Sequence, residues 1–502
     1  MKIEDIIETV ARDRFEGVLG LLAISANILV GDKSMGELDL PAHLRRPDTL
    51  PVLEGAAKML LAEDAGVRFR VISNMLDSVD SRKSAVSWIR DGSASQLVDM
   101  LADASSAGFT FGSAIKPCLM FAFQAAQKGL KPRIQYQSIS NLDCALISQI
   151  AAIIEVDDLI KTPPGLPWSE AAGSDFEVEL MMPPFGAHFQ HVEDLPQPIL
   201  AGFGLEHGRR GRLSYESVAI AAALRAKGRA IISVSDGEMF RMVGVEPISR
   251  RNLTESNRLA AVMAVPPGLM FPGIMIKTNL VEVAPATETH DMVRFVDFGH
   301  ENLVSRGARS RLEVSDDVNW AEFLLSSASE ARGIVRDVGR DEIMDNSYVL
   351  TPERYLNTGP REKVDALLTK TEEALLMEVA DLIRPVSLTA SDDGEYTLSE
   401  AAPGDITARG FVGEPGRTFK VDRATYNKAV NQQLRPGDLI VAIKGAVGTV
   451  GIVPDTVPTG AENAIWTAGQ SMMIVRPKKR GGISHLVLYE YLSNSTVQKF
   501  IH

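Results

Sequence analysis

The sequence predicts an α/β protein in which helices cover both faces of a sheet, with a helical region before the sheet and a smaller α/β domain after it. Residues 91–300 alternate strand-like and helix-like segments, which is typical of such a sheet. Residues 1–90 carry apolar side chains at helical spacing. Residues 386–502 are rich in short strands, Gly and Pro. These patterns divide the chain into regions at 1–90, 91–345, 346–385 and 386–502.

The chain of 502 residues is long enough for about two to four domains. A hydrophobic fraction of 45% and a charged fraction of 23% are those of a globular protein. The N-terminus lacks the basic start and apolar core of a signal peptide, and the interrupted apolar stretch 18–30 is too short to span a bilayer. The two cysteines, Cys118 and Cys144, fit a reducing compartment. We therefore expect a cytoplasmic protein with no membrane association.

The first 90 residues are expected to be helical. Two runs of apolar residues at near-helical spacing predict helices, and the Pro-containing stretch 40–51 separates the two runs. The residues of the two runs are Ile6, Val10, Phe15, Val18 and Leu22, then Ala56, Leu60, Leu61 and Val67.

Residues 91–345 are expected to form the central α/β domain. Apolar runs bounded by Gly, Pro and polar residues predict the strands, and amphipathic runs such as 217–227 and 249–257 predict helices between them. The predicted strands span 108–112, 133–137, 178–182, 229–234, 260–265, 278–283 and 292–298.

Residues 346–385 are expected to be a connector followed by a spacer helix. Apolar residues recur at threes and fours over 352–383, Glu and Lys occupy the other face, and Pro385 ends the pattern. A spacer packed on a partner helix and a plain surface helix both fit this pattern. The apolar stripe consists of Val364, Leu367, Leu368, Leu375, Leu376, Val379, Leu382 and Ile383.

The net charge of −13 is distributed unevenly along the chain. Residues 401–502 contain 12 Lys and Arg against 7 Asp and Glu, a net charge of +5, which leaves −18 on residues 1–400. A basic end on an acidic body indicates a surface that faces nucleic acid. Chance variation of surface charge gives the same numbers, so charge alone does not decide the matter.

Residues 175–186 read DFEVELMMPPFG and resemble the catalytic motif of DNA adenine-N6 methyltransferases, a hydrophobic strand that ends in Asn-Pro-Pro-Phe-Gly. Pro183, Pro184 and Phe185 follow the motif, and Phe185 would offer a ring on which an extruded base stacks. Met182 stands where the family has Asn. That Asn accepts a hydrogen bond from the amine to be methylated, whereas a thioether is only a weak acceptor. The resemblance therefore implies DNA as the ligand, and Met182 argues against catalysis.

A longer stretch, residues 215–283, resembles the modification subunit of type I restriction–modification systems. Its most specific part reads AVMAVPPGLMFPGIMIKTNLVEV over residues 261–283. The resemblance implies a Rossmann-like class I methyltransferase sheet. It also implies S-adenosylmethionine as the cofactor, if the chain is active.

The positions that would bind S-adenosylmethionine differ from the family pattern. The family has a strand followed by Asp-Pro-Ala-Cys-Gly-Ser-Gly, and the matching stretch here is FTFGSAIKPCLM, residues 109–120. Phe111 stands at the acid, and Ile115 and Pro117 stand at two glycines that allow positive φ or close ligand approach. Ser138 stands at the acid expected after the next strand. Together these changes predict a pseudo-methyltransferase without cofactor, in which no catalytic residue is assigned.

The C-terminal region, residues 386–502, resembles one target recognition domain of a type I specificity subunit, and residues 346–356 resemble the connector before it. The segments Leu434–Ile440 and Lys444–Gly448 carry the resemblance. It implies a domain that reads base edges with Arg, Lys and amide side chains and holds phosphates with cations. The candidate DNA contacts are Arg409, Arg417, Lys420, Arg423, Lys428, Gln432, Gln433, Lys444, Lys478, Lys479 and Arg480.

The sequence leads to one hypothesis and two alternatives. The hypothesis is a catalytically inactive adenine-N6 methyltransferase-like protein of a restriction–modification or phage-defence system, which binds double-stranded DNA as a homodimer or with other subunits. The first alternative is an active S-adenosylmethionine-dependent DNA adenine-N6 methyltransferase, and the second is a scaffold subunit that does not bind DNA. No metal is expected, because the pair His188 and His191 lacks a third ligand.

Overall fold

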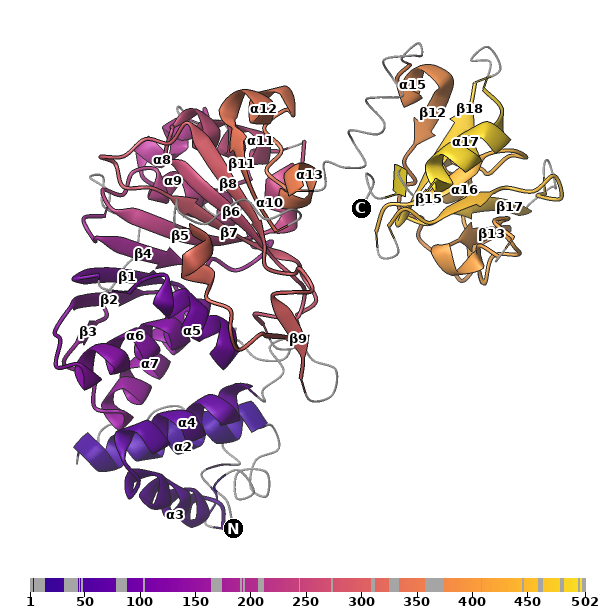
Figure 1. Cartoon of the computed structure of the whole chain (residues 1–502). Coiled ribbons are helices and arrows are strands. Elements are labelled where there is room, and N and C mark those ends of the chain that lie inside the picture. Colours follow the sequence, from indigo (N-terminus) through magenta and orange to yellow (C-terminus); the bar gives the residue numbers. More distant parts are fainter. Residues whose placement is uncertain are drawn as a thin grey trace. The chain divides into compact units, whose positions relative to one another are not determined.

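The computed structural model divides the chain into two compact units, Met1–Leu356 and Asn357–His502 (Figure 1). The structure describes residues 3, 14–30, 44, 46, 48–77, 88–102, 104–163, 174–189, 192, 195–205, 212–242, 244–271, 274–307, 312–324, 334–356, 374–407, 409–444, 447–458, 464–478, 483–494 and 497–498. No helix in this described part of the chain combines the length and the apolar character that crossing a bilayer requires.

The described residues of the N-terminal region are largely helical, as the spacing of its apolar residues predicts, while Ile6 and Val10 of the first predicted run lie outside the described residues. α2 packs against α3 and α7, so the N-terminal helices share one apolar core with the sheet. Pro51 occupies the first turn of α3, where a missing N–H leaves no hydrogen bond unmade. The helices are α2 (Arg14–Val30), α3 (Leu50–Leu61), α4 (Ala65–Asp77) and α5 (Asp91–Asp99).

A nine-stranded mixed sheet forms the centre of the first unit, with the order β11-β8-β6-β7-β5-β4-β1-β2-β3. β1 to β5 run parallel to one another, β7 runs antiparallel between β5 and β6, β6 is parallel to β8, and β11 is antiparallel to β8. The strands are β1 (Ser106–Thr110), β2 (Arg133–Gln137), β3 (Ile160–Lys161), β4 (Val178–Met181), β5 (Arg229–Ser235), β6 (Leu259–Val265), β7 (Thr278–Val283), β8 (Met292–Asp297) and β11 (Val335–Gly339).

Helices pack on both faces of this sheet, as predicted. Alternate residues of one strand enter different cores: Leu180 joins the core shared with α6 and α7, and Met181 joins the core under α9. The helices are α6 (Ile115–Gln127), α7 (Asn141–Ile153), α8 (Gln197–Gly202), α9 (Tyr215–Ala223), α10 (Asp236–Phe240), α11 (Glu246–Glu255), α12 (Arg340–Asp345) and α13 (Pro352–Leu356). Short elements complete the unit: the 3-10 turns η2 (Gly112–Ala114) and η6 (Trp320–Leu324), and the pair β9 (Val304–Arg306) and β10 (Leu312–Val314).

The second unit contains two small sheets, one of four strands in the order β12-β18-β15-β16 and one of three in the order β14-β13-β17. The abundance of short strands in the sequence is therefore confirmed. The strands are β12 (Ala380–Ile383), β13 (Tyr396–Ala401), β14 (Arg417–Val421), β15 (Leu439–Ala442), β16 (Val450–Ile452), β17 (Ala464–Ala468) and β18 (Met472–Pro477). The helical elements are α15 (Leu376–Val379), η7 (Pro403–Asp405), α16 (Arg423–Val430) and α17 (His485–Ser493).

The predicted spacer helix is wrong over its last residues. Leu382 and Ile383 belong to β12, which pairs antiparallel with β18, so backbone pairing overrides the helical spacing of these side chains. The helical turn before them ends at Val379. Residues 357–373, which hold the middle of the predicted helix, lie outside the described residues.

Candidate functional site

The carboxyl ends of the parallel strands β1, β2 and β4 bring the sequence-predicted cofactor and base positions together. The Phe111 N–H after β1 donates to the Gln137 carbonyl at the end of β2, at 2.8 Å. The Met182 N–H after β4 donates to the Thr110 carbonyl at the end of β1, at 3.0 Å. The structure therefore places the resembling motifs at one edge of the sheet, where open α/β sheets bind ligands.

Phe111 turns its ring into an apolar cluster. Its φ of +73° lies in the left-handed region, which a bulky residue occupies only when its surroundings hold it there. The buried ring packs edge-on against Tyr215, with ring centroids 5.9 Å apart, and shares a cluster with residues of α8 and α9. An apolar ring that packs this way leaves no carboxylate at the position where the family has its acid.

Ile115 and Pro117 do not lie in a loop. The turn between β1 and the following helix spans only Phe111 to Ala114, and Ile115 begins α6. Both side chains are buried, so they face the core. The two positions that the resemblance aligned with glycines therefore belong to the first turn of a packed helix.

Lys116, between them, is a fully buried cation that the sequence did not single out. Its ammonium lies 2.7 Å from Asp77 Oδ1, also bonds the Asp91 carboxylate, and sits 5.4 Å from the centre of the Trp88 ring. Burial raises the pKa of Asp77, and the nearby Lys116 opposes that rise. The network ties the start of α6 to the end of α4 and the start of α5.

Ser138 does not supply an acid, but it orients one from the next helix. Ser138 Oγ donates to Asp143 Oδ2 at 2.5 Å, and Ser140 caps α7 by accepting the Asp143 N–H. Asp143 is only 5% exposed, and burial raises its pKa. Its Oδ1 has no hydrogen-bond partner among the described residues.

The Asp143 carboxylate lies directly against the β1–α6 turn. A Cβ placed on Gly112 would lie 2.9 Å from Asp143 Oδ2, so the carboxylate already fills the space that a side chain would need there. Sequence reasoning missed Asp143 because it looked for an acid at the strand end, whereas this one is five residues later in the first turn of α7.

The Pro-Pro-Phe-Gly loop after β4 begins in the core and ends at the surface. Met182 is 1% exposed, and its thioether packs with the apolar residues of the core. Pro184 is exposed. The half-buried Phe185 ring packs edge-on against Phe271 at 5.5 Å, so one contact of this ring is already made within the chain.

A single carboxylate holds the end of this loop. Glu216, near the start of α9, accepts the Gly186 N–H at 2.9 Å and the Ser235 N–H at 2.6 Å. Gly186 has a φ of +67°, which suits a glycine. Nearby, Ser217 Oγ donates to Glu238, and burial raises the pKa of that carboxyl to about 7.

Lys277, within the string that resembles modification subunits, joins three elements. Its ammonium lies 3.0 Å from Asp236 Oδ1, after β5, and 2.6 Å from Glu353 Oε2, on α13. Burial lowers the pKa of Lys277, but the two carboxylates outweigh burial and raise it overall. Through these two ion pairs the lysine, just before β7, links the end of β5 to α13, the last helix of the unit.

Glu179 is a buried acid in the middle of β4. It is 7% exposed, and its Oε2 has no hydrogen-bond partner among the described residues. Burial raises its pKa to about 7. The carboxyl lies next to Gly108 of β1, where an added Cβ would come within 3.1 Å of its oxygen.

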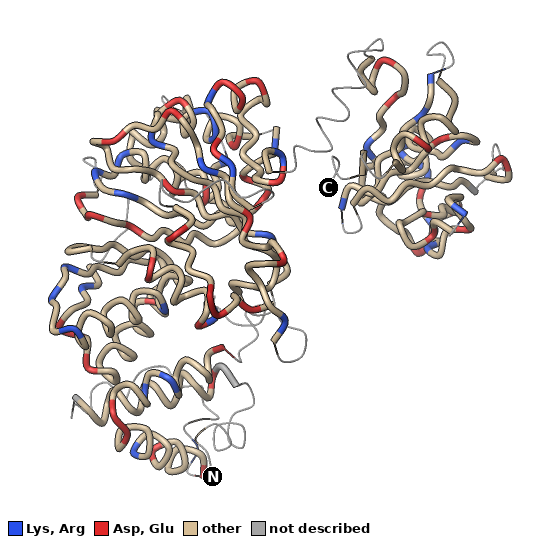
Figure 2. The backbone as a smooth tube through the Cα atoms, viewed as in Figure 1, with Lys and Arg blue, Asp and Glu red and all other residues tan. Residues whose placement is uncertain are grey.

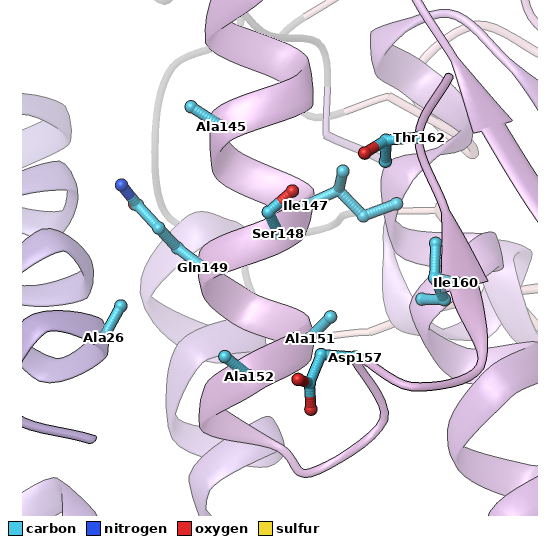
Figure 3. A pocket seen from close by; sticks show the side chains of 10 residues that line it. All are labelled: Ala26, Ala145, Ile147, Ser148, Gln149, Ala151, Ala152, Asp157, Ile160 and Thr162. Carbon is cyan, nitrogen blue, oxygen red and sulfur yellow. The ribbon is translucent and has the colours of Figure 1, made fainter. Parts of the chain in front are cut away.

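A cavity of about 330 Å³ lies beside α7, away from these positions (Figure 3). It is bounded by α7, α2 and the end of β3, and Asp157 supplies its carboxylate. None of the positions predicted for the donor or the base lines it.

The structure spreads the predicted DNA contacts over several elements of the second unit. Arg417 and Lys420 lie on β14 three residues apart, so their side chains leave opposite faces of the strand. Arg417 Nη1 donates to Glu400 Oε1 at 2.5 Å, and the guanidinium lies over the Phe419 ring. The other exposed candidates are Arg409, Arg423, Lys428 and Lys444, while Lys479 and Arg480 lie outside the described residues. Figure 2 shows that Lys and Arg are interspersed with Asp and Glu in this unit.

The structure contradicts the prediction that Gln432 contacts DNA. It is 3% exposed, its Oε1 accepts the Val386 N–H at 2.7 Å, and its Nε2 donates to Thr467 Oγ1 at 3.0 Å. An amide used in this way cannot reach a base edge. Gln433 is half-buried, and Lys478 lies at the end of β18 with its ammonium on the Met377 carbonyl at 2.6 Å.

Comparison with known proteins agrees with the fold of the first unit. Residues 167–364 match the family described as N-6 DNA Methylase. The type I restriction enzyme MpnII methylase subunit of Mycoplasma pneumoniae is 24% identical over 175 residues, which are 33% of this chain and 31% of that protein. The match thus spans about a third of the length of this relative.

A solved structure leads to the same fold. The methyltransferase subunit of a type I restriction–modification system from Streptococcus thermophilus superposes with a TM-score of 0.51 and 15% identity, covering 66% of this chain and 75% of that chain. A putative class I S-adenosylmethionine-dependent methyltransferase from Listeria monocytogenes is less similar, with a TM-score of 0.42 and 11% identity, covering 59% and 91%. Over residues 167–364 the chain matches the N-6 DNA methylase family, and the unit that contains most of these residues shares the fold of the Streptococcus thermophilus subunit.

Proposed function

We propose that this chain is a DNA-binding subunit of a restriction–modification or phage-defence system whose methylase-like unit does not transfer methyl groups. The observation that carries the proposal is that Ile115 and Pro117, the two positions aligned with the family's glycines, are buried in the first turn of α6. Side chains of a packed helix therefore lie where a methyltransferase leaves the backbone open to the donor.

Three further observations support the loss of the donor site. Phe111 points into an apolar cluster, the Asp143 carboxylate lies against the turn between β1 and α6, and the Met182 thioether is buried where an amide would have to face the base. The residues present at these strand ends therefore do not fit S-adenosylmethionine. We derive no methyl-transfer step for this chain.

The second unit carries a net charge of −1 as a whole, and its support for the DNA-binding part of the proposal lies in exposed cations of its C-terminal part. Residues 401–502 carry a net charge of +5, and Arg409, Arg423, Lys428 and Lys444 are all exposed. The proposed partner is double-stranded DNA. A homodimer, or a complex with other subunits of the system, would supply the second recognition domain that specificity subunits have.

One observation favours the first alternative, an active DNA adenine-N6 methyltransferase. Asp143 is a carboxylate near the end of β2, where methyltransferases hold the ribose of the donor. If the turn opens in solution, Asp143 could take the role that Ser138 cannot.

Isothermal titration calorimetry with S-adenosylmethionine distinguishes the two. The proposal expects no binding at micromolar protein and ligand, and no transfer of radiolabelled methyl to adenine in duplex DNA. Binding that Asp143→Ala abolishes, and that Ser113→Ala leaves intact, would establish the active enzyme instead.

A DNA-binding titration over a salt series distinguishes the proposal from a scaffold that does not bind DNA. Fluorescence anisotropy with a labelled duplex should give a dissociation constant that rises steeply with salt, because each neutralised phosphate contributes about 0.9 to the logarithmic slope. Absence of binding at low salt would favour the scaffold.

A further inference from the structure

A basic cleft in the second unit lies apart from most of the predicted DNA contacts. It has a volume of about 620 Å³, and its walls come from the turn before β15, the end of β18, β12 and the start of α17. The cationic side chains on it are Arg435, Arg476, Lys478 and His485, and the acids are Asp381 and Asp438.

The floor of the cleft is a neutral, buried ion pair. Arg476 Nε and Nη2 each lie 2.8 Å from one oxygen of Asp438, and Asp438 is 2% exposed. Asp438 also accepts the Arg435 N–H at 2.8 Å, and Arg476 donates to the Gln433 carbonyl at 2.7 Å. This pair therefore fixes the turn that carries Arg435 without itself offering charge to a ligand.

The cations that remain available stand on the rim. Arg435 is exposed, and its backbone is held by Asp438 while its guanidinium is at the surface. The Lys478 ammonium donates to the Met377 carbonyl and lies 3.7 Å from Asp381, which leaves it further donor capacity. Arg and Lys together are the usual ligands of a phosphate group.

The turn is shaped for close approach. Gly437 has a φ of +76°, and a Cβ there would lie 3.3 Å from Nδ1 of His485, the first residue of α17. Among the described residues, His485 is the aromatic residue that lines the cleft, so this part of the chain offers no wide ring there on which a base could stack. The chemistry is that of a phosphate site rather than a base-reading site.

We propose that this cleft binds a backbone phosphate of duplex DNA, with Arg435 and Lys478 as the phosphate ligands. The inference rests on the proposed DNA-binding function and adds a contact that does not depend on DNA sequence. The negative charge of Asp381, on the rim, opposes phosphate binding, so its removal should tighten DNA binding.

The test is fluorescence anisotropy of the full chain with labelled duplexes of two unrelated sequences. Arg435→Gln and Lys478→Gln should each weaken binding by about tenfold for both duplexes, as expected for a charged hydrogen bond. Each should lower the logarithmic salt slope by about one. Asp381→Asn should tighten binding by about two- to fivefold.

Two variants separate geometry from net charge. Arg384→Gln removes an exposed arginine just beyond the far end of β12 and should change affinity far less than Arg435→Gln. Gly437→Ala keeps every charge but crowds His485, and it should also weaken binding. Thermal melting of each variant checks that the unit remains folded. Arg435→Gln removes no described hydrogen bond of the side chain, so it should leave the fold intact, and its effect on binding decides the test.

The outcomes are distinct. If the unmodified chain binds DNA but Arg435→Gln, Lys478→Gln and Asp381→Asn do not alter it, the cleft is not a phosphate site for DNA and the proposed function stands. If Arg435→Gln abolishes calorimetric binding of inorganic phosphate yet leaves DNA affinity unchanged, the cleft binds free phosphate and the inference is wrong. If the unmodified chain does not bind DNA, the proposed function fails first.

Discussion

The turn between β1 and α6 in the first unit and the turn before β15 in the second are built alike: each has a glycine, a buried acid against it and a cation nearby. In the first, Asp143 rests against Gly112 and has hydroxyl rather than cationic partners among its described bonds. In the second, Asp438 is paired below the turn by Arg476, and the cleft beside Gly437 stays open.

This difference shows that the partner of a carboxylate decides where the carboxylate lies relative to a turn. Asp438 is neutralised beneath its turn and leaves the outer side of the turn free. Asp143 is held by Ser138 and lies against the turn itself. Lys116, the cation near the first turn, does not neutralise the Asp143 carboxylate, because it is bound to Asp77 and Asp91.

The largest expected effect is a loss of stability on replacing Arg476, which pairs with Asp438 at the turn before β15. Arg476→Met leaves Asp438 buried without its cation, which should lower the free energy of unfolding of the second unit by about 4 kcal/mol. Urea unfolding of the full chain, followed by a probe in the second unit, measures the loss. Lys444→Met, which removes an exposed cation of the same unit, should have little effect. A loss in Arg476→Met no larger than in this control would mean that the ion pair does not hold the turn.

The second largest expected effect is the loss of stability on replacing Lys116, the buried cation next to the turn between β1 and α6. Lys116→Met leaves Asp77 and Asp91 facing each other, and should lower the free energy of unfolding of the first unit by about 3 kcal/mol. The loss is expected to be smaller than for Arg476 because Asp91 is 55% exposed and water screens its charge. Lys128→Met, an exposed lysine just after the same helix, is the control. Equal melting temperatures for the two variants would contradict the structural role of Lys116.

An effect close in size to that of Lys116, but dependent on pH, concerns a buried acid without a cation, Glu179, in contrast with Asp438. Burial raises the pKa of Glu179 from 4.5 to about 7, so between these values the folded protein keeps a proton that the unfolded chain has lost. The contribution of Glu179 to stability therefore falls as pH rises through this window and is constant above it. Glu179→Gln should be about 3 kcal/mol more stable than the unmodified chain at pH 8 and equal to it near pH 4.

Urea unfolding at the two pH values measures the Glu179 effect. Glu177→Gln is the matched control, because the Glu177 carboxylate is exposed and accepts the Ser105 hydroxyl and N–H, which lower its pKa. That variant should show no gain at pH 8. The same gain in both variants would show that burial of Glu179 is not its cause.

Much of the fold could be predicted from the sequence because local patterns agree with the tertiary structure. The strands 133–137 and 278–283 have the predicted bounds, since clear turn residues flank their apolar runs. β3 has two residues and offers no pattern to recognise. β12 was predicted as helix because Leu382 and Ile383 fit a helical stripe, and only their pairing with β18 decides otherwise.

The site was less predictable, because its deciding contacts join distant parts of the chain. The resemblance located Phe111, Ser138 and Met182 at the strand ends, and the structure brings them together. It could not reveal Asp143, which takes part through the geometry of α7, or Lys116, whose partners lie on α4 and α5. Arg435 was passed over because only the folded turn places it on the rim of a cleft with Lys478.

The Glu216 carboxylate has a mechanical consequence. One oxygen accepts the Gly186 N–H in the loop after β4, and the other accepts the Ser235 N–H at the end of β5. Any movement of the loop relative to the sheet edge therefore breaks a charge-assisted bond, so the carboxylate anchors the Pro-Pro-Phe-Gly loop to the rigid end of β5.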